Sequence, residues 1–246
     1  MISVSIVSHG HENHVRRLVA DLDAIERPDL EVLLTLNAPE DRALRGLSAP
    51  FPLTFLVNDT PRGFSTNHNA AFRAARGDFF CVLNPDLRLS SDPFRRLLQA
   101  LEEDRVGVAA PHVLEPDGSA QATYRPVPTP GRLFRKALGF KEAVPSETAQ
   151  RVYPDWIGGM FMLFRRSAFE LVGGFDERYF LYYEDVDICC RLWLAGRKVC
   201  VAKDAVVVHE GQRASRRNLR YLRWHLQSIW RFFHSPVYRR FVSQPR

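Results

Sequence analysis

The sequence predicts an α/β protein with a mostly parallel central sheet and helices on both of its faces. Two observations predict this class. In the first half of the chain, short apolar runs typical of buried strands alternate with longer segments whose apolar residues recur at helical spacing. The length of 246 residues, with 46% hydrophobic and 25% charged residues, is that of an ordinary globular chain. Ligands of such sheets bind beyond the carboxyl ends of the strands, so polar residues at those ends are the first candidates for a site.

The elements of the first half are expected in a regular order. Strands are predicted over residues 3–7, 31–36, 53–58 and 79–83. A helix is predicted over residues 12–25 because one of its faces would be apolar, through Val15, Leu18, Val19, Leu22 and Ile25. Two further helices follow from their start signals: residues 65–75, with Ser65 as N-cap, and residues 92–103, with Asp92 as N-cap and Pro93 at the first helical position.

A carboxylate stands where the strand over residues 79–83 ends, in Asn84-Pro85-Asp86. Proline cannot extend the ladder and stiffens the turn, so Asp86 is expected to project from the carboxyl edge of the sheet. Glycine-rich phosphate loops of the GxGxxG or GxxxxGKS/T kind occur nowhere in the chain. Dehydrogenase and P-loop functions are therefore disfavoured, and a divalent metal held by Asp86 is the simplest remaining way to neutralise a phosphate.

In the second half, three carboxylates, Glu184, Asp185 and Asp187, crowd the start of the apolar helix predicted over residues 188–195. The helix dipole favours acids there by about 0.3–1 kcal/mol each, which is one explanation. The other is a base in a pocket of low dielectric, because four aromatic residues precede the acids: Tyr179, Phe180, Tyr182 and Tyr183. These residues alone leave both explanations open.

No stretch approaches the roughly 18–20 consecutive apolar residues of a membrane span, and the N-terminus lacks the basic start of a signal peptide. A cytoplasmic location is expected. The four cysteines show no CxxC spacing and lie in apolar surroundings, so they are predicted to be buried thiols: Cys81, Cys189, Cys190 and Cys200.

Positive charge is concentrated at the C-terminus. Nine of the 34 basic residues, and no acid, follow Glu210, so residues 1–210 hold 25 basic against 28 acidic residues. Nucleic acid binding is disfavoured because no motif that reads a nucleic acid accompanies this block. An apolar stripe at helical spacing runs through the same segment, which suits an anionic membrane surface or packing on the protein's own core: Leu219, Leu222, Leu226, Ile229, Trp230 and Phe233.

Several motifs, in order along residues 1–235, together resemble the family 2 glycosyltransferases of the GT-A fold, and among them the rhamnosyltransferase-like members that build bacterial surface polysaccharides. They are Val4-Ser-Ile-Val-Ser8, Pro61-Arg-Gly-Phe-Ser-Thr-Asn-His-Asn-Ala70, Leu83-Asn-Pro-Asp86, Gly158-Gly-Met-Phe-Met-Leu-Phe-Arg-Arg-Ser-Ala-Phe169, Gly173-Gly-Phe-Asp-Glu-Arg-Tyr-Phe-Leu-Tyr-Tyr-Glu-Asp-Val-Asp187 and Val208-His-Glu-Gly211. The resemblance implies a Rossmann-like, three-layer α/β/α domain over residues 1–212. Its nucleotide-sugar half would be about residues 1–115 and its acceptor half about 150–212. Residues 213–246 would form a basic, aromatic, helical extension.

The resemblance also implies roles for individual residues. Asp86 would bind Mg²⁺ or Mn²⁺, with His209 completing the metal shell, although a histidine that merely ends a strand is the alternative. Asp185 would be the catalytic base. The donor would be bound by Ser8, Arg62, Gly63, Asn67, Asn84 and Asp86, and the acceptor by Trp156, Gly158, Gly159 and Glu184. His9 and His11, at the end of the first strand, are left open as ligand contacts.

The implied activity is inverting transfer of a sugar, rhamnose being one candidate, from a nucleotide-diphosphate donor to a hydroxyl of a glycan or lipid-linked acceptor. The alternative is an inactive nucleotide-sugar-binding scaffold. The enzyme would work in the cytoplasm or on the inner face of the cell membrane. If the C-terminal stripe packs on the core instead, Arg213, Arg216 and Arg217 could close over the donor diphosphate. One departure stands out: the family's Asp-Asn after its second strand is Leu36-Asn37 here, so that carboxylate cannot recognise the nucleobase.

Overall fold

The computed structural model describes residues 1–138, 149–211 and 219–244. The strands of its main sheet are β1 (Ile2–Ser8), β2 (Leu30–Leu36), β3 (Leu53–Val57), β4 (Phe79–Leu83), β5 (Leu87–Arg88), β6 (Val106–Leu114), β8 (Arg151–Val152), β10 (Phe161–Arg165) and β11 (Lys198–His209). A separate pair is formed by β7 (Tyr124–Arg125) and β9 (Trp156–Ile157). The helices are α1 (Glu12–Ala24), the 3₁₀ helix η1 (Pro39–Gly46), α2 (Phe64–Ala74), α3 (Phe94–Glu102), α4 (Pro130–Ala137), α5 (Arg166–Leu171), α6 (Glu184–Leu194), α7 (Leu219–His234) and α8 (Pro236–Ser243).

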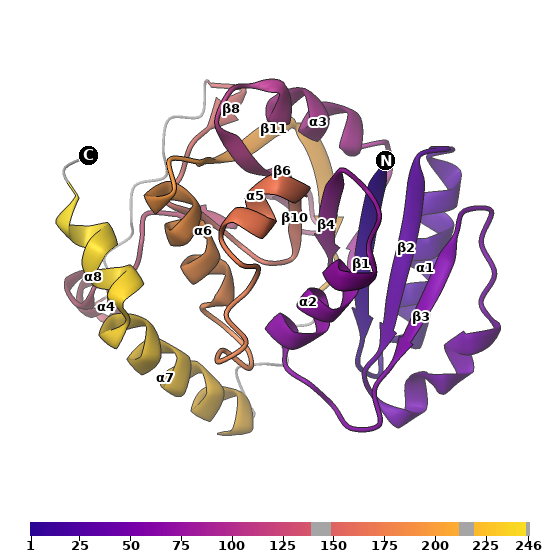
Figure 1. Ribbon diagram of the computed structural model, residues 1–246, viewed down its shortest axis with the longest axis horizontal. Coiled ribbons are helices and arrows are strands. Elements are labelled where there is room, and N and C mark those ends of the chain that lie inside the picture. The colour runs from indigo at the N-terminus through magenta and orange to yellow at the C-terminus, as the bar shows by residue number, and fades with distance from the viewer. Residues whose placement is uncertain (139–148, 212–218, 245–246) are drawn as a thin grey trace.

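The main sheet has the order β3-β2-β1-β4-β10-β6-β11-β5, and β8 also pairs with β11 (Figure 1). Strands β3, β2, β1 and β4 are parallel, while β10 is antiparallel to both β4 and β6. Strand β11 runs parallel to β6. The predicted α/β class with a mostly parallel sheet is therefore confirmed.

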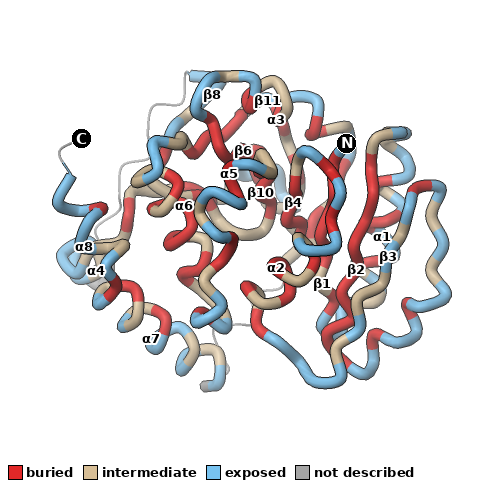
Figure 2. Tube along the Cα trace, in the orientation of Figure 1, coloured by how far each residue is buried: buried red, intermediate tan, exposed pale blue. Residues whose placement is uncertain are grey.

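Helices cover both faces of the sheet because successive strand side chains point to opposite sides. In β4, Cys81 and Leu83 join the core formed with α1, η1 and α3, whereas Phe80 and Val82 join the core formed with α2, α5 and α6. Figure 2 shows the central strands buried along most of their length. This is the three-layer arrangement that the sequence predicts.

The structure corrects two details of the predicted elements. Helix α2 begins at Phe64 with Gly63 at its N-cap, so Ser65 lies inside the first turn and does not cap the helix. Strand β6 and the first half of β11 were not predicted, although they lie side by side within the sheet. Gly107 and Pro111 weaken the strand signal of β6, and a bulge between Ala202 and Val206 interrupts the register of β11. The expected cap of α3 is present, because Asp92 Oδ1 accepts a hydrogen bond from the Phe94 N–H at 2.9 Å.

The C-terminal helices pack against the aromatic run before α6. Phe232 of α7 and Phe241 of α8 are buried with Tyr179, Tyr183 and Val186. Of the predicted apolar stripe, Ile229 and Phe233 belong to this packing, and Arg213, Arg216 and Arg217 lie outside the described residues. None of the helices in the described ranges has the length and apolar character needed to cross a bilayer. All four cysteines are free and buried, as predicted.

Candidate active site

Polar residues follow three neighbouring parallel strands at one edge of the sheet. His9 comes after β1, Asn37 after β2 and Asn84 after β4. All three line a cavity of about 640 Å³, called here the sheet-edge cavity, which is also lined by His11, Glu40, Arg62, Gly63, Asn67 and Asp86. The expectation that a site lies beyond the carboxyl ends of the strands is therefore met by the geometry.

Asp86 and His209 meet at the wall of this cavity. Strand β5 pairs with the end of β11, and the Glu210 N–H donates to the Asp86 carbonyl at 2.9 Å, so the two side chains are brought together by backbone hydrogen bonds. His209 Nε2 lies 3.1 Å from Asp86 Oδ2. Burial by itself would raise the pKa of Asp86, but the hydrogen bond and charge interaction with His209 outweigh it and lower that pKa.

These two side chains suit a divalent cation. Oδ1 of Asp86 is buried and has no hydrogen-bond partner within the described chain, so it is available as a ligand. Bonds of about 2.1 Å to adjacent corners of an octahedron place two ligand atoms about 3 Å apart, close to the observed separation. His209 Nδ1 lies 3.0 Å from Gln121 Oε1, so with a cation bound the tautomer protonated on Nδ1 would donate to Gln121 and leave the Nε2 lone pair for the cation in place of the hydrogen bond to Asp86. The described ranges contain no cluster of three metal-ligating side chains.

The loop that carries Arg62 is clamped by asparagines. Asn37 Oδ1 accepts from the Arg62 N–H at 2.8 Å, and Asn37 Nδ2 donates to the Arg62 carbonyl at 3.0 Å. Asn67 Nδ2 donates to the same carbonyl at 3.1 Å. Asn58 links the two clamps, because its Nδ2 donates to both Asn37 Oδ1 and Asn67 Oδ1. Asn67 therefore lines the cavity but uses its amide to position Arg62, whose own side chain is exposed.

The loop after β1 is held by a buried acid that the sequence analysis missed. Asp41 in η1 accepts hydrogen bonds from the Ser8 hydroxyl at 2.5 Å and from the Gly10 N–H at 3.0 Å. Its other oxygen accepts from the Ala38 N–H at 3.0 Å. Ser8 is fully buried and acts through this anchor, while its neighbour His9 lines the cavity. Asp41 follows the Asn37 position by four residues, and nothing in its local pattern signals this tertiary role.

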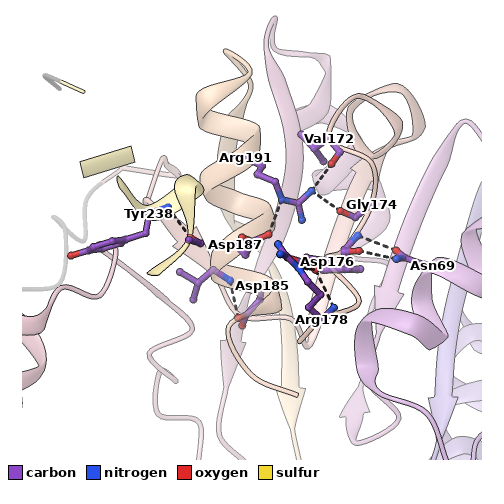
Figure 3. Close-up of polar contacts among 12 residues, drawn as sticks. Asn69, Val172, Gly174, Asp176, Arg178, Asp185, Asp187, Arg191 and Tyr238 are labelled. Atoms are coloured by element: carbon purple, nitrogen blue, oxygen red, sulfur yellow. Dashed lines mark hydrogen bonds and ion pairs between the residues drawn. The ribbon is translucent and has the colours of Figure 1, made fainter. Parts of the chain in front are cut away.

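The three acids at the start of α6 have different surroundings. Asp187 Oδ2 accepts from Arg191 Nε at 2.7 Å, and Arg191 Nη1 donates to the carbonyls of Val172 and Gly174 (Figure 3). The Gly173-Gly174 turn is also held by Asn69, which exchanges hydrogen bonds with the backbone of Phe175. Asp187 therefore ties α6 to this turn and has a structural role.

Asp185 faces a second cavity of about 240 Å³, called here the α6 cavity, together with Glu184 and Trp156. Two backbone N–H groups hold its carboxylate: Val186 donates to Oδ1 at 2.8 Å and Gly159 to Oδ2 at 3.1 Å. Burial raises the pKa of Asp185 to about 6 despite these hydrogen bonds. Burial and the nearby Asp185 charge raise the pKa of Glu184 well above its usual value. The shift in Glu184 favours its protonated form, whereas a pKa of about 6 leaves Asp185 able to accept a proton at neutral pH, which suits Asp185 as a base.

The backbone before α6 is unusual. Tyr182 and Tyr183 have φ values of +71° and +68°, in the left-handed region that side chains other than glycine seldom adopt. Such residues cost about 1–3 kcal/mol each and persist where the surrounding structure holds them. Because Tyr183 immediately precedes α6, its conformation sets where Glu184 and Asp185 point. Stabilisation of the acids by the helix dipole alone explains neither the strained backbone of Tyr182 and Tyr183 nor the position of Asp185 at the α6 cavity.

Gly159 lies between a residue that lines the sheet-edge cavity and one that lines the α6 cavity. A Cβ atom on Gly159 would be 3.2 Å from Phe64 Cζ in the sheet-edge cavity and 3.5 Å from Asp185 Cβ. Gly158 donates its N–H to the Thr123 carbonyl at 2.7 Å, so it fixes the chain next to the site. Trp156 lines the α6 cavity and donates Nε1–H to the Pro126 carbonyl at 3.1 Å.

Helix α7 contributes to both cavities, which the sequence analysis did not foresee. Arg220, Tyr221 and Trp224 line the sheet-edge cavity, whereas His225 and Ile229 line the α6 cavity. Trp224 packs on Phe180 with 4.5 Å between ring centroids. The sequence pattern did not indicate this role, because Tyr221 and Trp224 lie outside the apolar stripe that predicts the helix.

Comparison with known proteins decides the family. The model of a family described as "Glycosyltransferase like family 2" matches residues 1–225. The chain belongs to this glycosyltransferase family. The resemblance predicted from the sequence motifs is thereby confirmed, and the protein is a glycosyltransferase.

Two relatives and one solved structure illustrate the match. The rhamnosyltransferase WbbL of Escherichia coli (strain K12) is 28% identical over 94% of this chain and 92% of its own length. An N-acetylglucosaminyl-diphospho-decaprenol L-rhamnosyltransferase of Mycobacterium tuberculosis is 32% identical over 94% of this chain and 83% of its own. The mannosyltransferase PcManGT from Pyrobaculum calidifontis, solved with GDP-Man and Mn²⁺, superposes with a TM-score of 0.64 at 17% identity, over 94% of this chain and 64% of that one. That likeness supports the predicted GT-A fold.

Proposed function

We propose that this glycosyltransferase moves a sugar, with inversion, from a nucleotide-diphosphate donor to a hydroxyl of a glycan or lipid-linked acceptor. The observation that carries the proposal is a pair of cavities, one lined by Asp86, which contacts His209, and the other lined by Asp185. Rhamnose is the proposed sugar because two relatives that match most of the chain are named rhamnosyltransferases.

The donor would occupy the sheet-edge cavity. Asp86 and His209 would hold Mg²⁺ or Mn²⁺, which when bound would neutralise charge on the diphosphate leaving group. Magnesium commonly binds through one or two carboxylates plus substrate phosphates and water, which agrees with the small number of protein ligands here. Arg62, held by its asparagine clamp, and Arg220 of α7 add positive charge to the same cavity.

The nucleobase would have to be recognised without the family's usual acid. Leu36 stands at that position and is buried, with 1% of its surface exposed. Glu40 of η1 lines the sheet-edge cavity, close along the chain to Asn37. We propose that the Asn37–Glu40 wall, and not a residue at position 36, contacts the base.

The acceptor would enter the α6 cavity beside Asp185. Asp185 would take the proton from the acceptor hydroxyl as the oxygen forms its bond to the anomeric carbon. The bond between that carbon and the diphosphate would break on the opposite side, and the diphosphate would leave with the bonding electrons. A single displacement of this kind needs one base and correct alignment of the reacting atoms. Trp156 and Glu184 would help to orient the acceptor sugar.

The relative that acts on a decaprenol-linked sugar supports a lipid-linked acceptor. Such an acceptor would be reached from the cytoplasmic face of the membrane, where nucleotide sugars are also found. The sharpest test of the function is a screen of nucleotide sugars for a rise in melting temperature with Mn²⁺, followed by turnover with the best donor. Donor-dependent stabilisation with neither transfer nor donor hydrolysis would favour the inactive scaffold instead.

A further inference from the structure

One face of α7 is not used by the fold. Leu222, Leu226 and Trp230 follow at intervals of four residues and therefore lie on the same side of the helix. They are 51%, 56% and 65% exposed. These three residues are called here the outer face of α7. The other side of the helix carries Ser228 and Phe232, which are buried.

The structure thus divides the apolar stripe seen in the sequence into two parts. Ile229 and Phe233 pack against α6 and the aromatic run, as a core stripe would. The outer face has no such contact with the core clusters of the described chain. In Figure 2, α7 accordingly alternates between buried and exposed positions along its length.

The surroundings of the outer face are basic. Arg223 of α7 and Arg239 of α8 are exposed. The segments that form α4, α7 and α8 contain no aspartate or glutamate. An apolar stripe on a helix that carries arginines and no acid is complementary to a surface that is apolar beneath and anionic above, which describes a bilayer of acidic phospholipids.

The part of the α6 cavity that α4 forms also has exposed apolar residues beside it. Leu133 of α4 and Ile229 of α7 both line that cavity. Beside Leu133, Phe134 is 66% exposed, and Leu138 just after the helix is 60% exposed. Exposed apolar and basic residues therefore flank the cavity on both sides.

We propose that α7 docks on an anionic lipid bilayer, with the outer face in the headgroup region and the neighbouring arginines against lipid phosphates. Docking in this orientation would bring the α6 cavity to the lipid surface. The benefit of that position for the reaction rests on the proposed function, in which the α6 cavity binds the acceptor. Tryptophan suits this position because its ring is amphipathic and favours the membrane interface. A second copy of the chain is a poorer occupant, because a symmetric contact through this face would bring identical arginines together.

The test is co-sedimentation with vesicles of phosphatidylcholine alone or of phosphatidylcholine mixed with phosphatidylglycerol. The full chain is expected to bind the mixed vesicles, and to bind them less as salt increases, because salt screens the arginines. The variant carrying Leu222→Gln, Leu226→Gln and Trp230→Gln should bind at least about tenfold more weakly. Leu171→Gln is the matched control, because Leu171 is 56% exposed but lies on α5.

Equal binding by the triple variant and the wild type, or no binding by the wild type, would overturn the proposal. So would a triple variant that changes a dimer into a monomer while vesicle binding stays the same, because the outer face would then join two copies. The rise in melting temperature with Mn²⁺ and a nucleotide diphosphate reports on the sheet-edge cavity and should be the same in the triple variant. Its absence from the wild type would contradict the proposed function and leave the docking result standing.

Discussion

His209 Nε2 lies 3.1 Å from Asp86 Oδ2, although 123 positions separate the two residues in the chain. The pairing of β5 with β11 creates this proximity. A histidine that merely ends a strand does not need a carboxylate partner, nor a glutamine that orients its other ring nitrogen. The arrangement supports a shared metal, and the first prediction follows from it.

Asp86→Ala should abolish metal-dependent binding of the nucleotide diphosphate, and His209→Ala should weaken it less. The charged oxygen ligand contributes more to a hard cation than the neutral imidazole does. Calorimetry with and without EDTA measures the effect, and Asp104→Ala, an exposed acid beyond α3, is the control. An affinity that neither EDTA nor Asp86→Ala changes would remove the metal from the proposal.

Asp185→Asn should lower turnover by about 10²–10⁴-fold, the usual scale for loss of a general base, with nearly unchanged donor affinity. Asp187→Asn should instead lower stability, because it breaks the ion pair with Arg191. Single-turnover rates at saturating donor separate the two effects. Retained turnover in Asp185→Asn would move the role of base to Glu184 or Asp187.

The pH dependence of turnover follows from the raised pKa of Asp185. A base works only when ionised, so turnover should fall as the pH drops through about 6. The measurement is the turnover rate at saturating donor and acceptor from pH 5 upward, and the residual rate of Asp185→Asn should lack this decline. A decline centred near the ordinary carboxyl pKa would show that Asp185 is not perturbed as the structure indicates.

Asp185 should also lower the stability of the fold at neutral pH. Its pKa in the folded state, about 6, lies above its ordinary value of 3.8, so folding favours the protonated form. The destabilisation is absent below the ordinary pKa and complete above pH 6, where it amounts to roughly 2–3 kcal/mol. Asp185→Asn should therefore melt several degrees higher than the wild type at pH 8, with a much smaller difference at pH 4. Thermal denaturation at both pH values tests this directly, and a lower melting temperature at pH 8 would contradict it.

The sequence predicted those parts of the site that depend on local patterns. Asp86 follows a buried strand, and Asp185 follows an aromatic run, so both could be found from neighbouring residues. The asparagine clamp around Arg62 could not, because Asn37, Asn58 and Asn67 meet only when β2, β3 and α2 have come together. The role of α7 stayed open between a membrane surface and the protein's own core for a related reason. The spacing of apolar residues predicts an amphipathic helix, but it does not show which of those residues will pack on the core.

Gly63→Ala should disturb the sheet-edge cavity. A Cβ atom at this position would lie 2.7 Å from the Phe180 carbonyl oxygen and 2.9 Å from Phe180 Cα, and backbone cannot move aside cheaply. The expected costs are about 1–3 kcal/mol of stability and a weaker affinity for the donor. Gly46→Ala is the control because nothing lies within 4 Å of its Cβ position. Donor affinity and melting temperature that match the control would show that the contact between Gly63 and Phe180 is not required.

Trp224→Ala should weaken donor binding about 5- to 30-fold, whereas Trp230→Ala should leave donor binding unchanged and weaken binding to anionic vesicles. Both residues belong to α7, but Trp224 lines the sheet-edge cavity and packs on Phe180, while Trp230 belongs to the outer face. The Arg220 guanidinium lies 5.6 Å from the centre of the Trp224 ring, so removing the ring also removes this cation–π contact. An aromatic contact and a cation–π contact together are worth about 1–2 kcal/mol, which gives the expected range. The pair is measured by donor titration and vesicle co-sedimentation in parallel. Two variants with the same pattern in both assays would mean that α7 acts as one unit, and the assignment of its two sides to two ligands would be wrong.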